Sequence, residues 1–146
     1  MKRVDRGGFA RMLLVLALAL PGCARTPPEQ QLREDVHDLG SAIERHDAGA
    51  VEDALAADFI GPGGMDRKAA RRLAQGMFLR YRDIGVTTGP LDIDLQADTA
   101  TVRFSAAMTG GAGALPGSGQ LYEVETAWRR EDDEWLLVNA HWKPKL

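Results

Sequence analysis

The chain has little of the residue types on which disulfide frameworks and metal sites are built. It has one cysteine, Cys23, and three histidines, His37, His46 and His141. A single cysteine excludes a disulfide within the chain, so the stability of the folded part comes from packing alone. The histidines are too dispersed for a recognisable zinc pattern, and the glycine-rich segments lack the strand-to-helix context of a phosphate loop. We therefore expect no cofactor.

Long hydrophobic runs are also lacking. The apolar stretch at residues 12–20 has nine residues, whereas a helix that crosses a bilayer needs about 20. Four basic residues precede this stretch and small residues end it, which is the layout of an export signal. The sequence therefore predicts that residues 1–22 direct export and are removed.

The end of this segment reads Leu20, Pro21, Gly22 and Cys23. The leucine three residues before the cysteine and the glycine directly before it resemble the signal of a bacterial lipoprotein, in which a small or aliphatic residue is usual where Pro21 stands. The resemblance implies that Cys23 becomes the lipidated first residue of the mature chain. Several acyl chains on one residue hold a small domain stably at a membrane. In Gram-negative lipoproteins a residue other than aspartate after the cysteine, here Ala24, implies the outer membrane, with the domain facing the periplasm.

The charge balance excludes one class of partner. Removal of residues 1–22 takes away four basic residues and one acid, which leaves 14 Lys and Arg against 20 Asp and Glu, a net charge of −6. An acidic chain binds nucleic acid poorly, so we expect no nucleic-acid partner. The remaining 124 residues suffice for one domain with a core. A lipidated tether is expected over residues 23–28 and the domain over residues 29–146.

Helical periodicity is predicted in the first half of the domain. A first helix starts near Glu29 and ends near His46, with apolar residues on one face at Leu32, Val36, Leu39 and Ile43.

A second, shorter helix is expected through Val51, Leu55 and Phe59, ended by the Gly and Pro residues at 61–64. A third is expected to begin at Asp66, a typical N-cap residue. Its apolar positions are again three or four residues apart: Ala70, Leu73, Met77, Tyr81 and Ile84.

After Gly85 apolar and polar residues alternate, which predicts half-buried antiparallel strands. One strand is expected at residues 91–95 and another at 99–108. Residues 109–119 contain five glycines and one proline and are expected to form a hairpin loop.

A second long hairpin is expected from residues 120–130 and 134–142. The last strand has apolar residues on both faces. One face lines the interior, so the other needs cover from a second protomer, from a loop or from the tether.

Three helices followed by about four strands predict an α+β fold, with the helices on one face of a curved, mainly antiparallel sheet that forms a cone. The order of elements, the triplet at residues 57–59 and the final hairpin at 128–130 and 134–138 resemble the nuclear transport factor 2-like superfamily, with its cystatin-like fold. That superfamily includes ketosteroid isomerases, polyketide cyclases, dehydratases, epoxide hydrolases and catalytically silent binding modules. The resemblance implies a fold, and a possible homodimer through the outer sheet face, but no single activity.

Enzymes of the superfamily place an acid or base inside the cone, where burial tunes its pKa. Ketosteroid isomerases carry a catalytic carboxylate just beyond the second helix, where this chain has residues 61–64 and no acid. Epoxide hydrolases of this fold use an Asp-Arg-Asp constellation, for which Arg103 between Asp98 and Asp58 is the available match.

The candidates for a polar group in the cone are Asp58, Tyr81, Tyr122, Asn139 and His141. Asn139 and His141 are two apart in one strand, so we expect their side chains on one face, with Trp135 and Leu137. His141 could act as a general base near neutral pH, or it could hydrogen-bond a neighbour or face solvent. Asp58 could equally be a surface acid, and Tyr81 a core residue.

A basic patch at the start of the third helix either meets anionic lipid headgroups or forms a solvated helix face. It consists of Arg67, Lys68, Arg71 and Arg72.

We therefore expect a periplasm-facing outer-membrane lipoprotein whose domain is a binding or interaction module for an apolar small molecule or an envelope protein. The alternative is a small isomerase, dehydratase or hydrolase that uses the cone pocket. A buried acid or histidine open to solvent in the cone favours the enzyme, and a filled or apolar cone favours the module.

Overall fold

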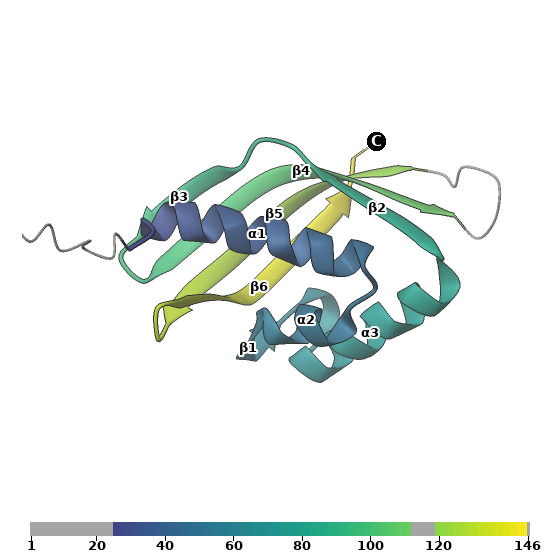
Figure 1. Cartoon of the computed structure of the whole chain (residues 1–146), viewed down its shortest axis with the longest axis horizontal. Coiled ribbons are helices and arrows are strands. Elements are labelled where there is room, and N and C mark those ends of the chain that lie inside the picture. The colour runs from purple at the N-terminus through teal and green to yellow at the C-terminus, as the bar shows by residue number, and fades with distance from the viewer. Residues whose placement is uncertain (1–24, 112–118, 146) are drawn as a thin grey trace, which may run out of the picture.

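The computed structural model describes residues 25–111 and 119–145 (Figure 1). The predicted export signal, the lipidated Cys23 and most of the predicted loop at 109–119 lie outside the described residues. Within the described ranges no helix is long and apolar enough to cross a membrane.

The first predicted helix is confirmed as α1 (Pro28–Glu44). Proline is suited to the first position of a helix, because its fixed φ angle is helical and no partner is needed there for a backbone N–H. The apolar stripe of α1 packs against the sheet, with Leu32 fully buried and Val36 nearly so.

The second predicted helix is shorter than expected and is followed by a strand. Helix α2 (Ala48–Asp53) ends early, and Leu55 and Phe59 both lie in β1 (Leu55–Ile60). The expectation of a helix through these two residues is wrong. Their spacing of four fits the period of a strand as well as that of a helix. The parallel pairing of β1 with the last strand, β6 (Glu134–Pro144), decides between the two.

Helix α3 (Arg67–Arg80) begins at the predicted cap, because the Asp66 side chain accepts a hydrogen bond of 2.7 Å from a backbone N–H of the first turn. It ends earlier than expected. Tyr81 has an extended backbone, and Ile84 lies in β2 (Asp83–Thr88), which pairs with β4.

Six strands form one sheet in the order β1-β6-β5-β4-β2, with β3 paired to the other half of β4 (Figure 1). The strands not yet named are β3 (Asp92–Gln96), β4 (Thr99–Gly111) and β5 (Gln120–Glu131). All neighbouring pairs are antiparallel except β1 and β6. The mainly antiparallel sheet is as predicted, but it has more strands than expected because β1 and β2 were not foreseen.

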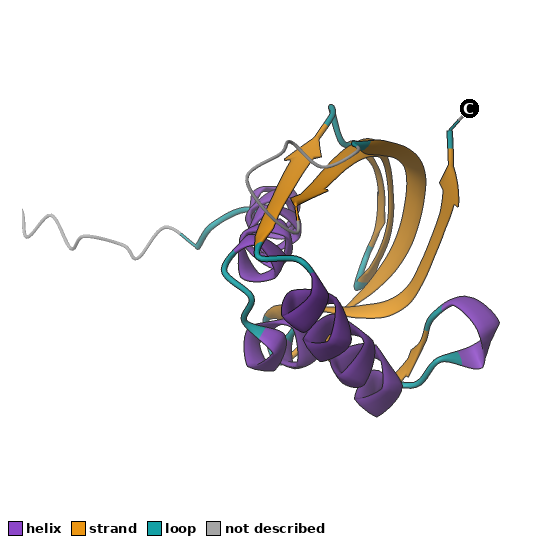
Figure 2. Ribbon diagram, turned by 90° about the vertical axis from the view of Figure 1, so that its right-hand side faces the viewer, coloured by secondary structure: helices purple, strands orange, loops and turns teal. Residues whose placement is uncertain are grey.

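Figure 2 shows that the sheet is curved and that α1 packs inside the curve. We call the helix-facing side the concave face and the opposite side the convex face. The core lies between α1 and the concave face, where Val102 and Trp128 are almost completely buried. The indole Nε1 of Trp135 donates a hydrogen bond of 2.9 Å to the backbone oxygen of Pro28, which ties the start of α1 to β6. The predicted α+β architecture is confirmed.

A β-bulge in β6 changes which side chains face the core. Ala127 of β5 pairs with Asn139, but the next residue, Trp128, pairs with Leu137. Val138 is therefore an extra residue that has no partner of its own.

The side chains beyond the bulge are on the opposite face from the one expected. Trp135 and Leu137 are buried on the concave face, whereas Asn139 and His141 are exposed on the convex face. The expectation that all four share a face is wrong, because strict alternation holds only while each residue has one partner. Asn139, His141 and Lys143 make the convex face polar beyond the bulge. The row of apolar side chains for which cover by a second protomer was one expectation is therefore not formed on this part of β6.

Candidate functional site

Two of the predicted site residues lie on the concave face. Tyr122 of β5 lies opposite Ala106 of β4, in the row of side chains that faces the helices. Tyr81 packs against Gly110, since a Cβ atom on this glycine would stand 3.1 Å from Cδ1 of the tyrosine. Both tyrosines are half-buried, so part of each side chain remains accessible.

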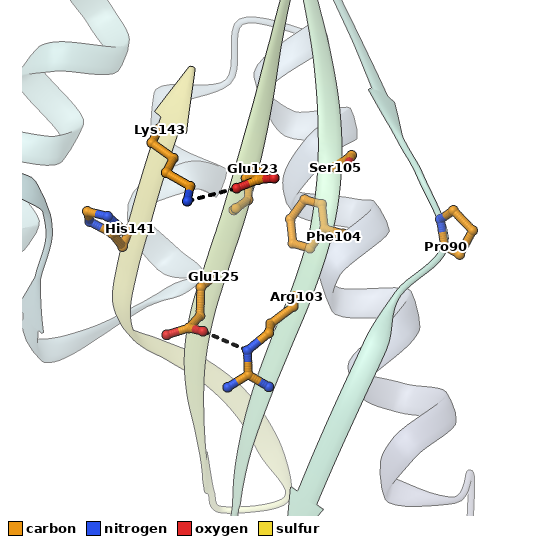
Figure 3. Close-up of a pocket in the computed structure, with 9 residues that line it drawn as sticks. Pro90, Arg103, Phe104, Ser105, Glu123, Glu125, His141 and Lys143 are labelled. Atoms are coloured by element: carbon orange, nitrogen blue, oxygen red, sulfur yellow. Dashed lines mark hydrogen bonds and ion pairs between the residues drawn. The ribbon is translucent and has the colours of Figure 1, made fainter. Parts of the chain in front are cut away.

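The other two predicted pocket residues, Asn139 and His141, do not face the cone. Asn139 donates a hydrogen bond of 2.7 Å from Nδ2 to the backbone oxygen of Ile60 and so fastens β1 to β6. His141 lies opposite Glu125 on the convex face, and Figure 3 shows its ring turned away from the neighbouring charged side chains. A base at this position cannot reach a ligand on the other side of the sheet.

The predicted Asp-Arg-Asp constellation does not form. Asp58 receives two hydrogen bonds from Arg129, of 2.8 and 3.2 Å, and Arg129 also donates to Glu131 at 2.7 Å. The hydrogen bond from Arg129 lowers the pKa of Asp58 below its ordinary value. Arg103 instead donates to Glu125 at 2.7 Å. Asp58 is therefore an exposed, ion-paired acid and not a group of the cone.

A shallow cleft of about 480 Å³ lies on the convex face across β4, β5 and β6 (Figure 3). Two ion pairs cross it, from Arg103 to Glu125 and from Lys143 to Glu123, the second with an N–O distance of 2.9 Å. The hydrogen bond from Lys143 lowers the pKa of Glu123. Each charge has a partner on the same face. The cleft is lined by Pro90, Arg103, Phe104, Ser105, Glu123, Val124, Glu125, His141 and Lys143.

A second cleft of about 480 Å³ lies between α1, α2 and the first residues of β6. It contains Asp35, whose pKa is raised from 3.8 to about 6. Burial is the largest cause, followed by the negative charges of Asp38, Glu134 and Glu34, while a hydrogen bond from a backbone N–H of β6 acts in the opposite direction. Burial and the neighbouring negative charges thus favour the protonated form of Asp35.

Asp35 was not recognised from the sequence, although a signal for it exists. It follows Leu32 by three residues and precedes Leu39 by four, so helical geometry places it beside the buried stripe of α1.

His46 also has an unusual position. It lies two residues after the end of α1 with a left-handed backbone (φ 59°), and its ring stacks on Phe78 of α3 with the ring centroids 5.0 Å apart. Its Nε2 atom is buried and has no hydrogen-bond partner among the described residues. The stacked ring of His46 therefore links the end of α1 to α3. In residues 25–111 and 119–145 no three His, Cys, Asp or Glu side chains are grouped so as to hold a metal ion.

The concave face of the central strands is apolar apart from Thr126 and Tyr122 and from Gln120 and Arg130 near the two ends of β5. The hydroxyl of Thr126 accepts a hydrogen bond of 2.9 Å from Nε1 of Trp128 and donates one of 3.3 Å to the backbone oxygen of Val102, so its polar atom is occupied. The register places these side chains on the concave face: Ala100, Val102, Phe104, Ala106, Met108, Tyr122, Val124, Thr126, Trp128, Leu137, Ala140 and Trp142.

The turn η1 (Pro62–Gly64), where the ketosteroid isomerase pattern would place its carboxylate, consists of proline and glycine. That pattern therefore finds no acid at this position.

Apolar side chains on the helix-facing side remain open to solvent. Trp142, on the concave face of β6, is 40% exposed, and Leu73 and Met77 of α3 are 47% and 38% exposed. Leu73 and Met77 follow Ala70, which packs against the core, by about one and two helical turns, and so lie on the same side of α3. The domain thus leaves apolar surface exposed on α3 and on the concave face of β6.

No protein-family model matches the chain, and no curated protein matches it. Solved structures do. A proposed dehydratase of the nuclear transport factor 2-like family from Streptomyces avermitilis is similar with a TM-score of 0.74 and 20% identity, over 82% of this chain and 97% of that one. A nuclear transport factor 2-like protein with a cystatin-like fold from Novosphingobium aromaticivorans gives 0.66 and 19%, over 79% and 80%. This chain has the nuclear transport factor 2-like, cystatin-like fold.

The same comparison shows how little the fold says about activity. Bd1075 from Bdellovibrio bacteriovorus has a TM-score of 0.71 and 16% identity, over 80% of this chain but only 41% of its own length, so this chain spans less than half of that protein. At these identities the likeness concerns the fold alone. The neighbours include proposed dehydratases and proteins of unknown function.

Proposed function

We propose that this protein is an envelope lipoprotein, anchored through Cys23, whose domain faces the periplasm and binds an apolar small molecule or an apolar segment of an envelope protein. The observation that carries the proposal is the concave face, which is apolar over its central strands and exposes Trp142 at one end.

The anchor is supported by the order of the first residues and by the short distance from Cys23 to the fold. Helix α1 begins at Pro28, five residues after the cysteine. Five residues span at most about 17 Å when fully extended. An acylated Cys23 therefore holds the domain close to the bilayer surface, where apolar ligands and membrane proteins are concentrated.

The binding role is supported by the chemistry of the lining. Ligand sites are mostly apolar and aromatic, with a few polar groups that fix orientation. Here the phenol groups of Tyr81 and Tyr122 supply such groups beside an otherwise apolar surface. An exposed indole such as that of Trp142 provides a large contact area with few rotatable bonds.

One observation favours the enzyme as a second candidate. The carboxyl group of Asp35 has a pKa of about 6 and lines a cleft, as expected of a general acid or base near neutral pH. An isomerase, dehydratase or hydrolase would on this basis use Asp35 and not His141, and its activity should fall by about 10² to 10⁴-fold in Asp35→Asn.

Native mass spectrometry of the purified full-length protein tests the binding role. We expect a ligand to co-purify with the wild-type protein and to be lost in Trp142→Ala. His141→Ala is the matched control, because it changes the adjacent residue on the opposite face. Loss of the ligand in His141→Ala with retention in Trp142→Ala would place binding on the convex face and refute the proposal.

A further inference from the structure

Helix α3 carries an outward stripe that the fold does not use. None of its 14 residues is buried, and it packs mainly on α2 and β1. Lys68, Arg72, Gln75 and Leu79 are separated by four, three and four residues, so they lie in one row along the helix. Leu79 is 88% exposed, more than any other large apolar side chain of the described residues.

The charges of α3 are unequally satisfied. The helix has five basic residues and no acid. Arg67 and Arg71 pair with Asp53 and Glu52 of α2, which neutralises the side of α3 next to α2. Within residues 25–111 and 119–145, no salt bridge includes Lys68 or Arg72, which precede Leu79 in the outward row.

A leucine in one row with cations that lack a salt bridge among the described residues is a disfavoured surface in water, but it fits the boundary between anionic headgroups and acyl chains. Cations bind the headgroups and the apolar side chain enters the layer below them. The positive row also stands out against a mature chain that is acidic by sequence, so attraction of this helix to a negative surface is local.

We propose that the row formed by Lys68, Arg72 and Leu79 docks on the anionic lipid surface of the membrane that holds the protein. This inference rests in part on the proposed lipid anchor. The anchor makes docking an intramolecular event with a high effective concentration, so a small contact suffices. Helix α1 is about 26 Å long and leads from the tether to α2, on which α3 packs. The domain would thus contact the bilayer at two separate places, the anchor and α3. Docking would therefore fix the orientation of the domain at the bilayer.

The single cysteine permits a direct test. In Leu79→Cys, residue 79 carries the only thiol that is free if Cys23 is acylated, and an environment-sensitive dye can be attached to it. We expect the dye on the full-length protein to shift to the blue and to be quenched by brominated lipids in vesicles that contain phosphatidylglycerol. We expect neither effect in vesicles of phosphatidylcholine alone, and high salt should reverse both. The same dye on Leu121→Cys, an exposed leucine of the convex face, is the control and should stay unquenched.

Charge reversal provides the second arm. Lys68→Glu with Arg72→Glu should weaken docking by roughly tenfold or more, whereas Lys143→Glu with Lys145→Glu, two basic residues at the end of β6, should leave it unchanged. Equal quenching at residues 79 and 121, or no dependence on phosphatidylglycerol, would overturn the proposal. A shift seen in native membranes but not in protein-free vesicles would overturn it in favour of a protein partner. Two labelled thiols per chain would show that the anchor proposal has failed, while the charge-reversal arm still decides whether α3 binds lipid.

Discussion

Replacing Asp35 with asparagine is expected to stabilise the protein at neutral pH and to have little effect in acid. Asp35 lies half-buried on α1 in a cleft with Asp38 and Glu134, and its pKa is raised from 3.8 to about 6. Because one pKa unit corresponds to about 1.4 kcal/mol, the full difference corresponds to about 3 kcal/mol. Water in the open cleft screens the charge, so we expect a gain of about 1 to 2 kcal/mol.

The sign follows from proton linkage. The folded protein binds the proton of Asp35 more tightly than the unfolded chain does, because the folded-state pKa is raised. The penalty for the buried charge is fully present above about pH 6 and disappears as the pH falls toward 3.8. Asparagine carries no charge at any pH, and its amide oxygen can still accept the hydrogen bond from the backbone N–H of Trp135.

Urea denaturation of the purified protein at about pH 7.5 and about pH 4 measures the effect. Asp94→Asn, at an exposed carboxylate of β3, is the matched control. Arg129 and Lys143 lower the pKa values of Asp58 and Glu123, so the stability that these two ion pairs contribute is lost only when the pH falls below the ordinary pKa of a carboxyl group. This loss is the same in wild type and variant and cancels from the comparison. A gain that is equal at both pH values, or a loss at pH 7.5, would refute the reasoning.

Three further predictions concern the anchor, the core and the concave face. Cys23→Ser should abolish labelling with fatty acid and membrane attachment, and a mutant that still fractionates as an integral membrane protein would contradict the lipid anchor. Phe104→Ala, which removes a ring packed against the core, should cost about 3 kcal/mol in urea denaturation, and Arg103→Ala about 0.5 kcal/mol; equal losses would mean that the two faces of β4 are assigned the wrong way round. Gly110→Ala should cost about 1 to 3 kcal/mol, because the new Cβ stands 3.1 Å from the ring of Tyr81; unchanged stability would show that this contact is absent.

The elements that could be predicted are those whose signals are local. The apolar stripe of α1 extends over about three turns, and the Asp66 cap depends only on backbone groups within one turn. The alternation in β4 likewise identifies Val102 as an interior residue, which is fully buried. Each of these features is decided by neighbours in the sequence, so the sequence alone reveals it.

The elements that were missed depend on distant partners. Leu55 and Phe59 are in a strand because β6 pairs with that strand, β1, from the other end of the chain. Ile84 leaves the helical pattern because β4 offers a partner strand. The extra residue Val138 has no signature in its own strand and exists only relative to β5. Candidate site residues that follow a bulge are therefore placed wrongly by any rule of alternation, as happened with His141.

The bulge at Val138 makes the chemistry of the concave face depend on the register of one strand. Deleting Val138 would leave Leu137 opposite Trp128 and Asn139 opposite Ala127, so residues 139–143 would keep their faces. Closing the bulge without a deletion would instead shift these residues by one partner and exchange their faces. His141 would then lie on the concave face opposite Val124, and Trp142 would lie on the convex face. An imidazole on the concave face thus takes a change of register and no substitution, so comparing homologues by residue identity at aligned positions would overlook it.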